Sequence, residues 1–422
     1  MISNPIPMTP QPSPLGLTKS FGFGDRLGLA TPGHLSAVSK SDFAPIFAQQ
    51  SIREMDRTQR TPIEVMDAAR TALEHAGFKG TWGADADHLK TEADIDVTAA
   101  VGFCLFTLDP SAYVENRADT MPADELEARI ASMVADGVLP ENWMEAYVNR
   151  PFEFDQGEPL VFSSEELSRA AVKYGRAIHH CERLNRHIES TVPGNRQEIE
   201  VSVDETDSPT SPLEHLFFAL ELRRRKVRVV SLAPRFVGAF EKGIDYIGDL
   251  RAFESDLERH VAIARAYGPY KISIHSGSDK FSIYPVIGRV CGSLLHVKTA
   301  GTSYLEALRV VCRTDPALFD SIAEYSRSRF DADKHSYHIS TTTGQIDRLF
   351  TDGGAREDRF LETIPGRQLL HVTFGSVLTV GKLPSGRTFH DALLENLNRE
   401  ADLYREVLDH HLGRHLSGLN QG

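Results

Sequence analysis

Hydrophobic and polar positions alternate along several short segments of the chain, as expected for strands that bury one face. In the segment 271–275, Ile272 and Ile274 point to one side, while the residues around them, ending with His275, point to the other. The polar loop Ser276-Gly-Ser-Asp-Lys follows at once. A histidine at a strand end before such a loop is typical of parallel α/β folds, whose sites lie beyond the carboxyl ends of the strands. A buried histidine with a structural role is the alternative.

Comparable patterns predict eight strands, separated for the most part by amphipathic segments that predict helices. Eight strand–helix units in one chain favour a closed (β/α)8 TIM barrel over an open sheet. The absence of a GxGxxG motif after the first strand also disfavours a dinucleotide-binding sheet. The predicted strands are residues 21–23, 95–107, 198–204, 227–233, 271–275, 293–299, 336–340 and 369–374. The predicted helices are residues 61–75, 123–136, 142–148, 163–187, 211–225, 249–267, 303–313, 316–330 and 389–411.

Two regions do not follow this alternation of strands and helices. Residues 1–19 begin with a stretch rich in proline and polar residues, which predicts a disordered tail and no signal peptide. Residues 110–160 form a long excursion after the second predicted strand, a position where lids and subunit contacts are common. We therefore predict one barrel domain over residues 20–422 with this insertion.

Composition and charge narrow the classes of function. The formal charge of −13 and the lack of a basic face argue against a nucleic-acid-binding protein. No apolar run approaches 18 residues, so no membrane span is predicted. The four cysteines lack CxxC spacing, which indicates buried thiols in a reducing, cytoplasmic setting. The sequence leaves open whether the chain forms a homo-oligomer.

Ionisable residues collect on one face of the predicted strands. If the apolar positions face the helices, the opposite positions face the barrel axis, and burying unpaired polar groups there costs about 2–7 kcal/mol each. A divalent metal would compensate, because it binds imidazoles and carboxylates together; Zn, Mn, Co, Ni and Fe are all compatible. The inward positions are Asp204, His275, His296, Lys298, His338 and His371. Of these, His296 lies deepest and favours a structural role, and Asp204 or Glu205 could instead cap the next helix.

Cations also follow several predicted strands and would suit an anionic small-molecule substrate. Arg26 follows the first strand, Arg235 the fourth and Lys280 the fifth, while Lys298 ends the sixth. Two or three such groups would bind a carboxylate or a phosphate. We favour a carboxylate, since the glycine-containing segment Thr373-Phe-Gly-Ser-Val is a weak phosphate motif.

Long motif blocks between about Ser20 and Gly381 resemble the tagaturonate epimerase family. They are Val203-Asp-Glu-Thr with Pro-Thr-Ser-Pro-Leu-Glu-His215, Ser231-Leu-Ala-Pro-Arg-Phe, Ser273-Ile-His-Ser-Gly-Ser-Asp-Lys-Phe-Ser, Lys298-Thr-Ala-Gly-Thr-Ser-Tyr-Leu-Glu-Ala and His371-Val-Thr-Phe-Gly-Ser. The resemblance implies a metal-dependent TIM-barrel isomerase that interconverts D-tagaturonate and D-fructuronate in hexuronate catabolism. Some members are expected to accept neutral ketohexoses.

The implied reaction assigns roles to the candidate residues. The two uronates differ at C3, counted from the carboxylate, and the ketone is at C5, so simple enolisation cannot invert C3. Retro-aldol cleavage and re-addition could, as could direct proton abstraction by two bases. We expect Asp204 to act as the base, with Lys298 or His275 as the acid. The expected metal ligands are Glu205, His275, His338 and His371. The expected substrate-binding residues are Arg26, Arg235, Ser276, Asp279, Lys280 and Thr299.

Two other functions remain open from the sequence. The same metal and base would serve an aldolase of class II type that releases its fragments as free products. A non-catalytic protein that binds a sugar acid on a barrel scaffold would show binding without turnover.

Overall fold

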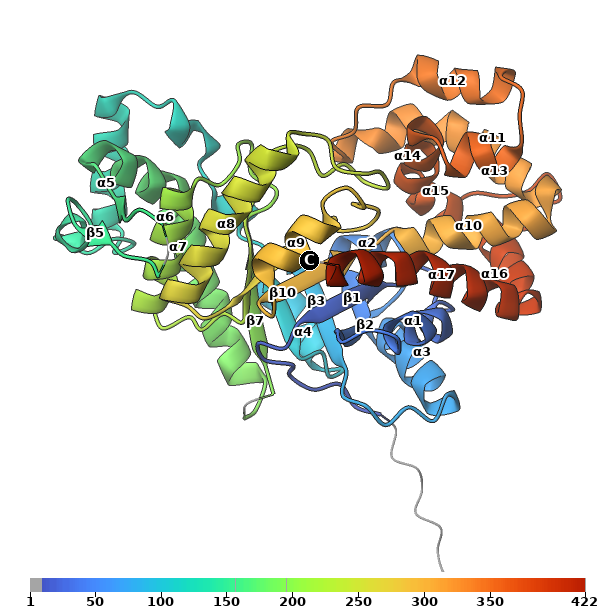
Figure 1. The fold of residues 1–422 in the computed structure, drawn as a ribbon, viewed down its shortest axis with the longest axis horizontal. Helices are drawn as coiled ribbons and strands as arrows, with labels where there is room; N and C mark the ends of the chain where they lie inside the picture. Colours follow the sequence, from blue (N-terminus) through green and yellow to red (C-terminus); the bar gives the residue numbers. More distant parts are fainter. Residues whose placement is uncertain (1–9, 156, 195, 422) are drawn as a thin grey trace, which may run out of the picture.

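Eight parallel strands form a closed barrel at the centre of the molecule (Figure 1). The computed structural model describes residues 10–155, 157–194 and 196–421. The barrel order is β1-β10-β9-β8-β7-β4-β3-β2, and β2 pairs with β1 to close it. The strands are β1 (Ser20–Gly24), β2 (Ala44–Ser51), β3 (Gly83–Leu89), β4 (Leu105–Leu108), β7 (Glu198–Ser202), β8 (Ser231–Ala233), β9 (Lys271–Ile274) and β10 (Leu295–Thr299). The predicted (β/α)8 fold is confirmed.

The segments that form the barrel differ in part from the predicted strands. Residues 336–340 and 369–374 are not strands: the first follows the 3-10 turn η4 (Lys334–Ser336) and the second lies in α14 (Ile364–Val372) and α15 (Phe374–Thr379). The sequence missed β2 and β3, which take their places in the barrel. Residues 95–107 are divided between helix α4 (Glu92–Ala99) and β4. The insertion therefore follows the fourth strand, not the second.

The remaining helices surround the barrel, and many begin where capping residues predict. Ser163 and Glu166 form a capping box at the start of α6, and Ser211 and Glu214 form another at the start of α7. The predicted last helix is divided at Glu400 into two. The helices are α1 (Thr31–Val38), α2 (Ile52–Thr58), α3 (Pro62–His75), α5 (Ala123–Ala135), α6 (Ser164–Thr191), α7 (Pro212–Arg224), α8 (Leu250–Tyr267), α9 (Tyr284–Cys291), α10 (Thr302–Thr314), α11 (Pro316–Asp333), α12 (Thr343–Thr351), α13 (Arg356–Leu361), α16 (Phe389–Arg399) and α17 (Ala401–Asn420).

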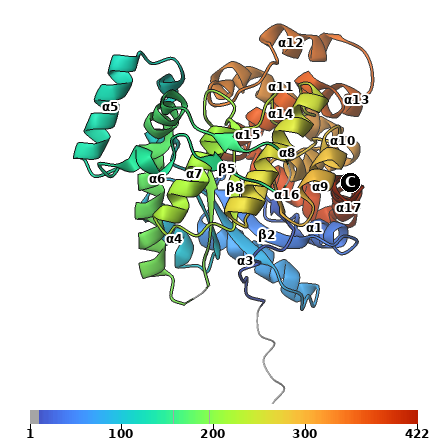
Figure 2. The same cartoon turned by 60° about the vertical axis from the view of Figure 1, so that its left-hand side comes forward.

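Two groups of elements extend beyond the barrel on opposite sides (Figures 1 and 2). On one side, the insertion between β4 and α6 carries α5, short 3-10 turns and the two-stranded hairpin β5 (Pro151–Phe152) and β6 (Leu160–Val161). The predicted helix at 142–148 is the 3-10 turn η3 (Trp143–Ala146). On the other side, helices α11 to α15 form a group that we call the helical cap.

The amino-terminal segment contacts the barrel over the part that the structure describes. Ser13 N donates to Trp82 O at 2.9 Å, and Leu15 is buried against Ile46 and Leu105. Residues 10–19 of the predicted disordered tail are therefore packed, whereas residues 1–9 lie outside the described residues. Within the described chain, we find no helix that combines the length and the apolar character needed to span a membrane.

Candidate active site

The barrel interior is polar near the carboxyl ends of the strands, and the ammonium of Lys298 lies at its centre. Lys298 Nζ is 2.7 Å from Asp85 Oδ2 and 2.8 Å from Asp87 Oδ1. It is also 2.8 Å from Glu200 Oε1 and donates to Thr107 Oγ1 at 2.6 Å. Burial opposes the charge, but the three carboxylates raise the pKa of Lys298 well above its usual value. Its ammonium therefore stays charged, and each of its protons has an acceptor.

His275 lies next to Lys298 and its acidic partners, just after β9, where the alternation of the strand places it. Its Nε2 donates to Glu200 Oε1 at 2.7 Å. Its Nδ1 is 3.4 Å from Asp204 Oδ1, and the Ser202 hydroxyl donates to the same oxygen of Asp204. The Asp204 side chain is 21% exposed, so this carboxylate reaches the open mouth of the barrel.

His88, at the carboxyl end of β3, is a second histidine that the sequence analysis did not single out. Its ring centroid is 5.1 Å from that of His275. Its Nδ1 donates to Asp109 Oδ2 at 3.1 Å, and Asp109 also lies 3.3 Å from Lys90 Nζ. The φ angle of His88 is +52°, a left-handed conformation that is uncommon for a residue with a side chain. Such backbone strain is found most often at functional sites.

The carboxylates around the two histidines raise the pKa of both imidazoles. Burial opposes protonation of His275, but Asp204 and the hydrogen bonds to Asp204 and Glu200 raise its pKa to about 10. Burial likewise opposes the charge of His88, but Asp87 and Asp109 raise its pKa to about 9. Burial alone would raise the pKa of Asp204, but the nearby His275 holds the pKa of this carboxyl well below the usual range.

Asp87, His88 and His275 form a group of metal-ligand type. One ligand atom from each lies within 4.8 Å of the others. Each histidine also has a carboxylate behind it, Asp109 for His88 and Glu200 for His275. Histidines that bind metals usually donate their second ring N–H to a carboxylate in this way, which fixes the tautomer and the ring orientation. The other ring nitrogens are His88 Nε2, which lies 3.9 Å from Asp87 Oδ1, and His275 Nδ1, which lies 3.4 Å from Asp204 Oδ1.

The structure places the other three predicted metal ligands elsewhere. Glu205 is exposed and pairs with Arg53, whose Nη2 is 3.1 Å from Glu205 Oε1. His338 is exposed in the segment after η4, and His371 is buried on α14. Among the described residues, only His275 of the predicted ligand set belongs to a group of ligand-type side chains. For His338 and His371, the reason is that residues 336–340 and 369–374 are not barrel strands, whereas Glu205 follows a true strand but points to Arg53.

Two of the six predicted substrate-binding residues, Arg26 and Ser276, lie around the mouth. The Arg26 guanidinium pairs with Glu54 at 2.6 Å and stacks 3.5 Å above the Phe374 ring, which leaves its buried Nη1 without a hydrogen-bond partner. Ser276, next to His275, accepts a hydrogen bond from Lys242 Nζ at 2.5 Å. Both side chains therefore remain candidates for contact with a ligand.

The remaining predicted substrate-binding residues are held in other contacts. Thr299 Oγ1 donates to Gly22 O at 2.7 Å, within the barrel wall. Arg235 is half-buried, and its backbone N donates to Thr210 Oγ1 at 3.0 Å. Lys280 is buried, and its Nζ donates to the carbonyls of Glu241, Ile244 and Ser278. Burial lowers the pKa of Lys280 to about 7.

Asp279 belongs to a buried ionic cluster rather than to the open mouth. Its carboxylate lies 2.7 Å from His411 Nε2 and 2.8 Å from Arg367 Nη2. Asp279, His411 and His415 form the second ligand-type group in the described chain. However, His415 Nε2 accepts from Asp279 N at 2.9 Å, and its Nδ1 donates to His411 O at 2.9 Å. With both ring nitrogens of His415 engaged, this group is a structural network that joins α14 and α17 to the loop after β9.

His296, for which the sequence favours a structural role, lies away from the mouth. It is fully buried below Lys298, and its Nδ1 lies 3.0 Å from Ser20 Oγ. Burial lowers the pKa of His296 to about 3, so this imidazole is neutral.

Sequence reasoning missed five residues of the site. Glu200 has the same parity as Asp204 in its strand, so the alternation that identified Asp204 could also have identified Glu200. Asp85, Asp87 and His88 lie in β3, whose sequence Gly-Ala-Asp-Ala-Asp-His-Leu lacks the β-branched residues typical of strands. Asp109 follows β4 and was interpreted only as the residue that ends the strand.

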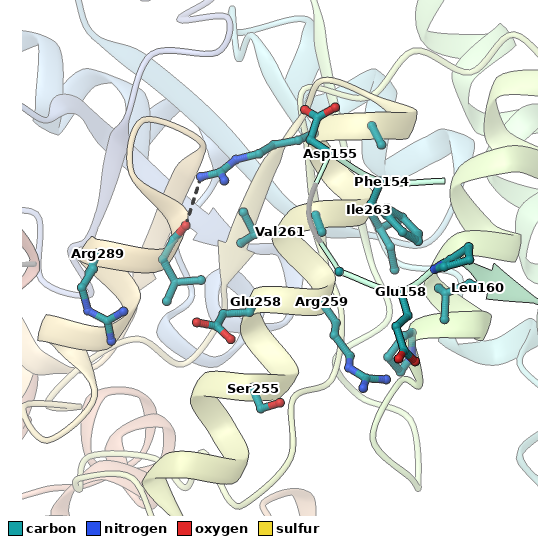
Figure 3. A pocket seen from close by; sticks show the side chains of 17 residues that line it. Phe154, Asp155, Glu158, Leu160, Ser255, Glu258, Arg259, Val261, Ile263 and Arg289 are labelled. Atoms are coloured by element: carbon teal, nitrogen blue, oxygen red, sulfur yellow. Dashed lines mark hydrogen bonds between the residues drawn. The ribbon is translucent and has the colours of Figure 1, made fainter. Parts of the chain in front are cut away.

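A large cavity of about 690 Å³ lies outside the barrel, between residues 154–155 and 157–160 near the hairpin and α8 (Figure 3). It is lined by side chains such as Glu158, Glu258 and Arg259, and Arg265 Nη2 donates to Val290 O at 3.2 Å on one wall. None of its lining residues belongs to the cluster at the strand ends. The polar mouth of the barrel is therefore the candidate active site.

Comparison with known proteins identifies the family that carries this site. The sequence model of the tagaturonate epimerase family matches residues 2–419. The chain belongs to this family. An epimerase from Thermotoga maritima, named tagaturonate/fructuronate epimerase, is 41% identical over 406 residues, which cover 96% of this chain and 82% of the relative.

Crystal structures of a second relative have the same fold as this member of the tagaturonate epimerase family. The fructuronate-tagaturonate epimerase from Cohnella laeviribosi is 37% identical, and the match covers 97% of this chain and 83% of that one. The TM-score is 0.90 for its native structure and 0.91 for its complex with one glycerol. Family membership therefore makes this barrel an epimerase.

Proposed function

We propose that the chain interconverts D-tagaturonate and D-fructuronate by inversion at C3, counted from the carboxylate. The main support is the match of the tagaturonate epimerase family over nearly the whole chain, together with the names of the two relatives. The barrel mouth supplies the groups that this reaction needs, namely ionised carboxylates and paired imidazoles beside an open surface. Action on neutral ketohexoses is a further expectation of the family resemblance.

We propose a retro-aldol route for the inversion. The hydrogen at C3 is β to the ketone at C5, so it is not acidified by that ketone. Removal of the proton from the C3 hydroxyl allows the C3–C4 bond to break, with its electron pair passing to the C4–C5 unit. The C3 aldehyde then turns its other face, the C3–C4 bond forms again, and the proton returns to the C3 oxygen. Atoms and electrons balance without an external oxidant or reductant.

Asp204 is the proposed base for the C3 hydroxyl. Its side chain is 21% exposed, the largest exposure among the acids in contact with His275, so a substrate can reach it. The hydrogen bond from Ser202 and the proximity of His275 fix its orientation and keep it ionised. A positioned base of this kind contributes about 10²–10⁴-fold to a rate.

The donor set at the mouth fits a divalent cation. We propose that Asp87, His88 and His275 hold it, with His275 retained from the sequence-based set and the other two in place of Glu205, His338 and His371. The fit rests on the grouping of their ligand atoms within 4.8 Å and on the carboxylate behind each imidazole. Imidazole and carboxylate ligands suit Zn, Mn, Co, Ni or Fe. When bound, such a cation supplies Lewis-acid stabilisation of negative charge on the ketone oxygen.

Lys298 is proposed to position the site rather than to transfer a proton. Its ammonium holds Asp87, a proposed ligand, and Glu200, the partner of His275, from below. Because its pKa is raised and its protons are all engaged, it is a poor acid. The remaining acid of the sequence analysis, His275, is assigned to the metal.

We also propose that residues 20–422 act as one domain in a reducing, cytoplasmic setting on a small sugar acid. The four cysteines, all buried and unbridged in the structure, support this setting.

The test is product analysis by nuclear magnetic resonance after incubation of the purified protein with each uronate in turn. Three samples are compared, as purified, after chelation, and after restoration with each candidate metal. The proposal expects the same equilibrium mixture from either uronate, a loss of conversion on chelation and its recovery with metal. Release of free aldehyde and ketone fragments would indicate an aldolase, and binding without conversion would indicate a binding protein.

Solvent deuterium oxide distinguishes the two routes. The retro-aldol route leaves the original hydrogen at C3, so the product contains no deuterium there. Incorporation of deuterium at C3 would contradict it and favour direct proton abstraction.

A further inference from the structure

Among the described residues, Lys242 is a cation at the barrel mouth that has no counter-ion and whose ammonium contacts a side-chain hydroxyl. It is half-buried in the loop that follows β8, and its Nζ donates to Ser276 Oγ at 2.5 Å. Two other cations at the mouth are paired, Arg26 with Glu54 and Arg53 with Glu205. Within the part of the chain that the structure describes, no ion pair joins Lys242 to a carboxylate.

The backbone on either side of Lys242 is fixed by buried cations. Lys280 Nζ donates to the carbonyl of Glu241 at 2.9 Å and also to that of Ile244. Arg367 Nε donates to the carbonyl of Gly243 at 2.6 Å. The position of Lys242 beside Ser276 is therefore imposed by the fold and is not that of a freely rotating surface lysine.

The adjacent acid is held away from Lys242. Glu241 Oε2 accepts from Gln368 Nε2 at 2.7 Å and from Ser340 N and Oγ at 2.9 and 3.0 Å. The carboxylate nearest in sequence is thus committed to the helical cap and leaves the charge of Lys242 without compensation.

A buried polar atom without a partner lies beside the same loop. His371 is 2% exposed, and its Nδ1 has no hydrogen-bond partner. This atom is 3.6 Å from the position that a Cβ on Gly243 would occupy, and the ring packs so closely on Gly301 that a side chain there would overlap it. Burial and the charges of Arg26 and Lys242 lower the pKa of His371 well below its usual value, so it is neutral.

We infer that Lys242, with the hydroxyl of Ser276 and the unpaired ring nitrogen of His371 nearby, forms the subsite that binds the carboxylate of the sugar acid. This inference rests on the proposed function, since it names the part of that substrate which the subsite recognises. Ser276 follows His275 directly, so the subsite adjoins the proposed metal group. Lys242 is then the residue that distinguishes a uronate from the neutral ketohexose with a hydroxymethyl group in the same place.

The experiment compares wild type, Lys242→Met, Lys242→Arg and the control Lys79→Met, an exposed lysine before β3 at the other end of the barrel. Steady-state kinetics are measured with D-tagaturonate and with D-tagatose. Lys242→Met should lower kcat/KM for the uronate about 10- to 100-fold, as expected for the loss of a hydrogen bond to a charged group. The loss should appear mainly in KM, because the carboxylate takes no part in breaking the C3–C4 bond. Lys242→Arg should restore part of it.

Two controls distinguish a failure of the proposed subsite from a failure of the proposed function. The kcat/KM for D-tagatose should change by less than about 3-fold in Lys242→Met, since D-tagatose has no carboxylate for Lys242 to bind. Where D-tagatose is not turned over, its Kd from calorimetry replaces the kinetic value. The subsite is disproved if Lys242→Met binds and converts the uronate like wild type, or if it weakens both sugars equally. If wild type binds the uronate without converting it and Lys242→Met weakens that binding, the subsite stands and the proposed function fails.

Discussion

Strands β3, β4 and β7 are neighbours in the barrel and carry five acidic side chains at or near the mouth, whereas the arc from β8 through β9 and β10 to β1 carries cations. The acids are Asp85, Asp87, Asp109, Glu200 and Asp204, and the cations are Lys242, Lys280, Lys298 and Arg26. Lys298 crosses the interior to the acidic arc, Arg26 pairs with Glu54 on α2, and Lys280 donates to carbonyls of the loop after β8. Under the proposed function and the inferred subsite, the keto end of the substrate lies on the acidic arc and its carboxylate lies near Lys242.

The largest effect is expected on the acidic arc, from His275→Ala. Removal of a proposed ligand should lower metal affinity by more than the roughly 10- to 100-fold that loss of an outer partner costs. Conversion of the uronates should fall with it. Metal content by mass spectrometry and equilibrium dialysis measures the effect.

Glu200→Gln and His335→Asn calibrate this result. Glu200 is the outer partner of His275, so its change should weaken metal binding by about 10- to 100-fold only. His335 is exposed on η4, and its change should have no effect. Equal metal affinity in His275→Ala and wild type would remove His275 from the ligand set.

Asp204→Asn tests the base while leaving the shape of the side chain unchanged. We expect kcat to fall by about 10²–10⁴-fold because the amide cannot take the C3 hydroxyl proton. Metal content should stay near one ion per chain if Asp204 is only the base. Loss of the metal together with activity would make Asp204 a ligand.

Lys298→Met tests whether the acidic arc depends on the cation that reaches it from β10. The change leaves three buried carboxylates without their shared partner, and the free energy of unfolding should fall by about 3–5 kcal/mol. Urea denaturation measures it, with Lys79→Met expected within about 0.5 kcal/mol of wild type. A variant as stable as wild type would show that the carboxylates do not need the ammonium.

The smallest effect is expected in the buried ionic network around Asp279, behind the arc of cations from β8 to β1. His411 faces Asp279, Glu306, Arg367 and His415; burial opposes its charge, but the two acids raise its pKa. A raised folded-state pKa contributes stability that is fully present below the unfolded value of about 6.5 and is lost as pH rises through the folded value. His411→Gln should therefore cost more stability at pH 6 than at pH 9, as judged by denaturation at both. An equal cost at both values would mean that His411 is neutral in the native state.

The alternation of residues was a sound guide where the strands are ordinary. In β9 and β10, Ile272, Ile274, Leu295 and Val297 face the helices, which correctly places His275 and Lys298 inside the barrel. The predicted count of eight strands included two wrong segments and missed β2 and β3, so the barrel was predicted from six correct strands together with amphipathic and well-capped helices.

The pattern of hydrophobic and polar residues was misleading where function or burial decides the residue types instead of strand propensity. Strand β3 consists of small and acidic residues because it lines the site, so it lacks the composition of a strand. The run Leu-Leu-His-Val-Thr-Phe at 369–374 is apolar because it is a buried helix, and periodicity cannot separate a short buried helix from a buried strand. His338 and His371 were therefore placed on strands that do not exist, and His88 was missed.

The most direct test of the account compares metal content and uronate conversion in wild type, His88→Ala and His338→Ala. We predict one divalent ion per chain in wild type, its loss with activity in His88→Ala, and its retention in His338→Ala. Full conversion by wild type after complete chelation, or loss of the ion from His338→Ala but not from His88→Ala, would contradict the proposed metal site.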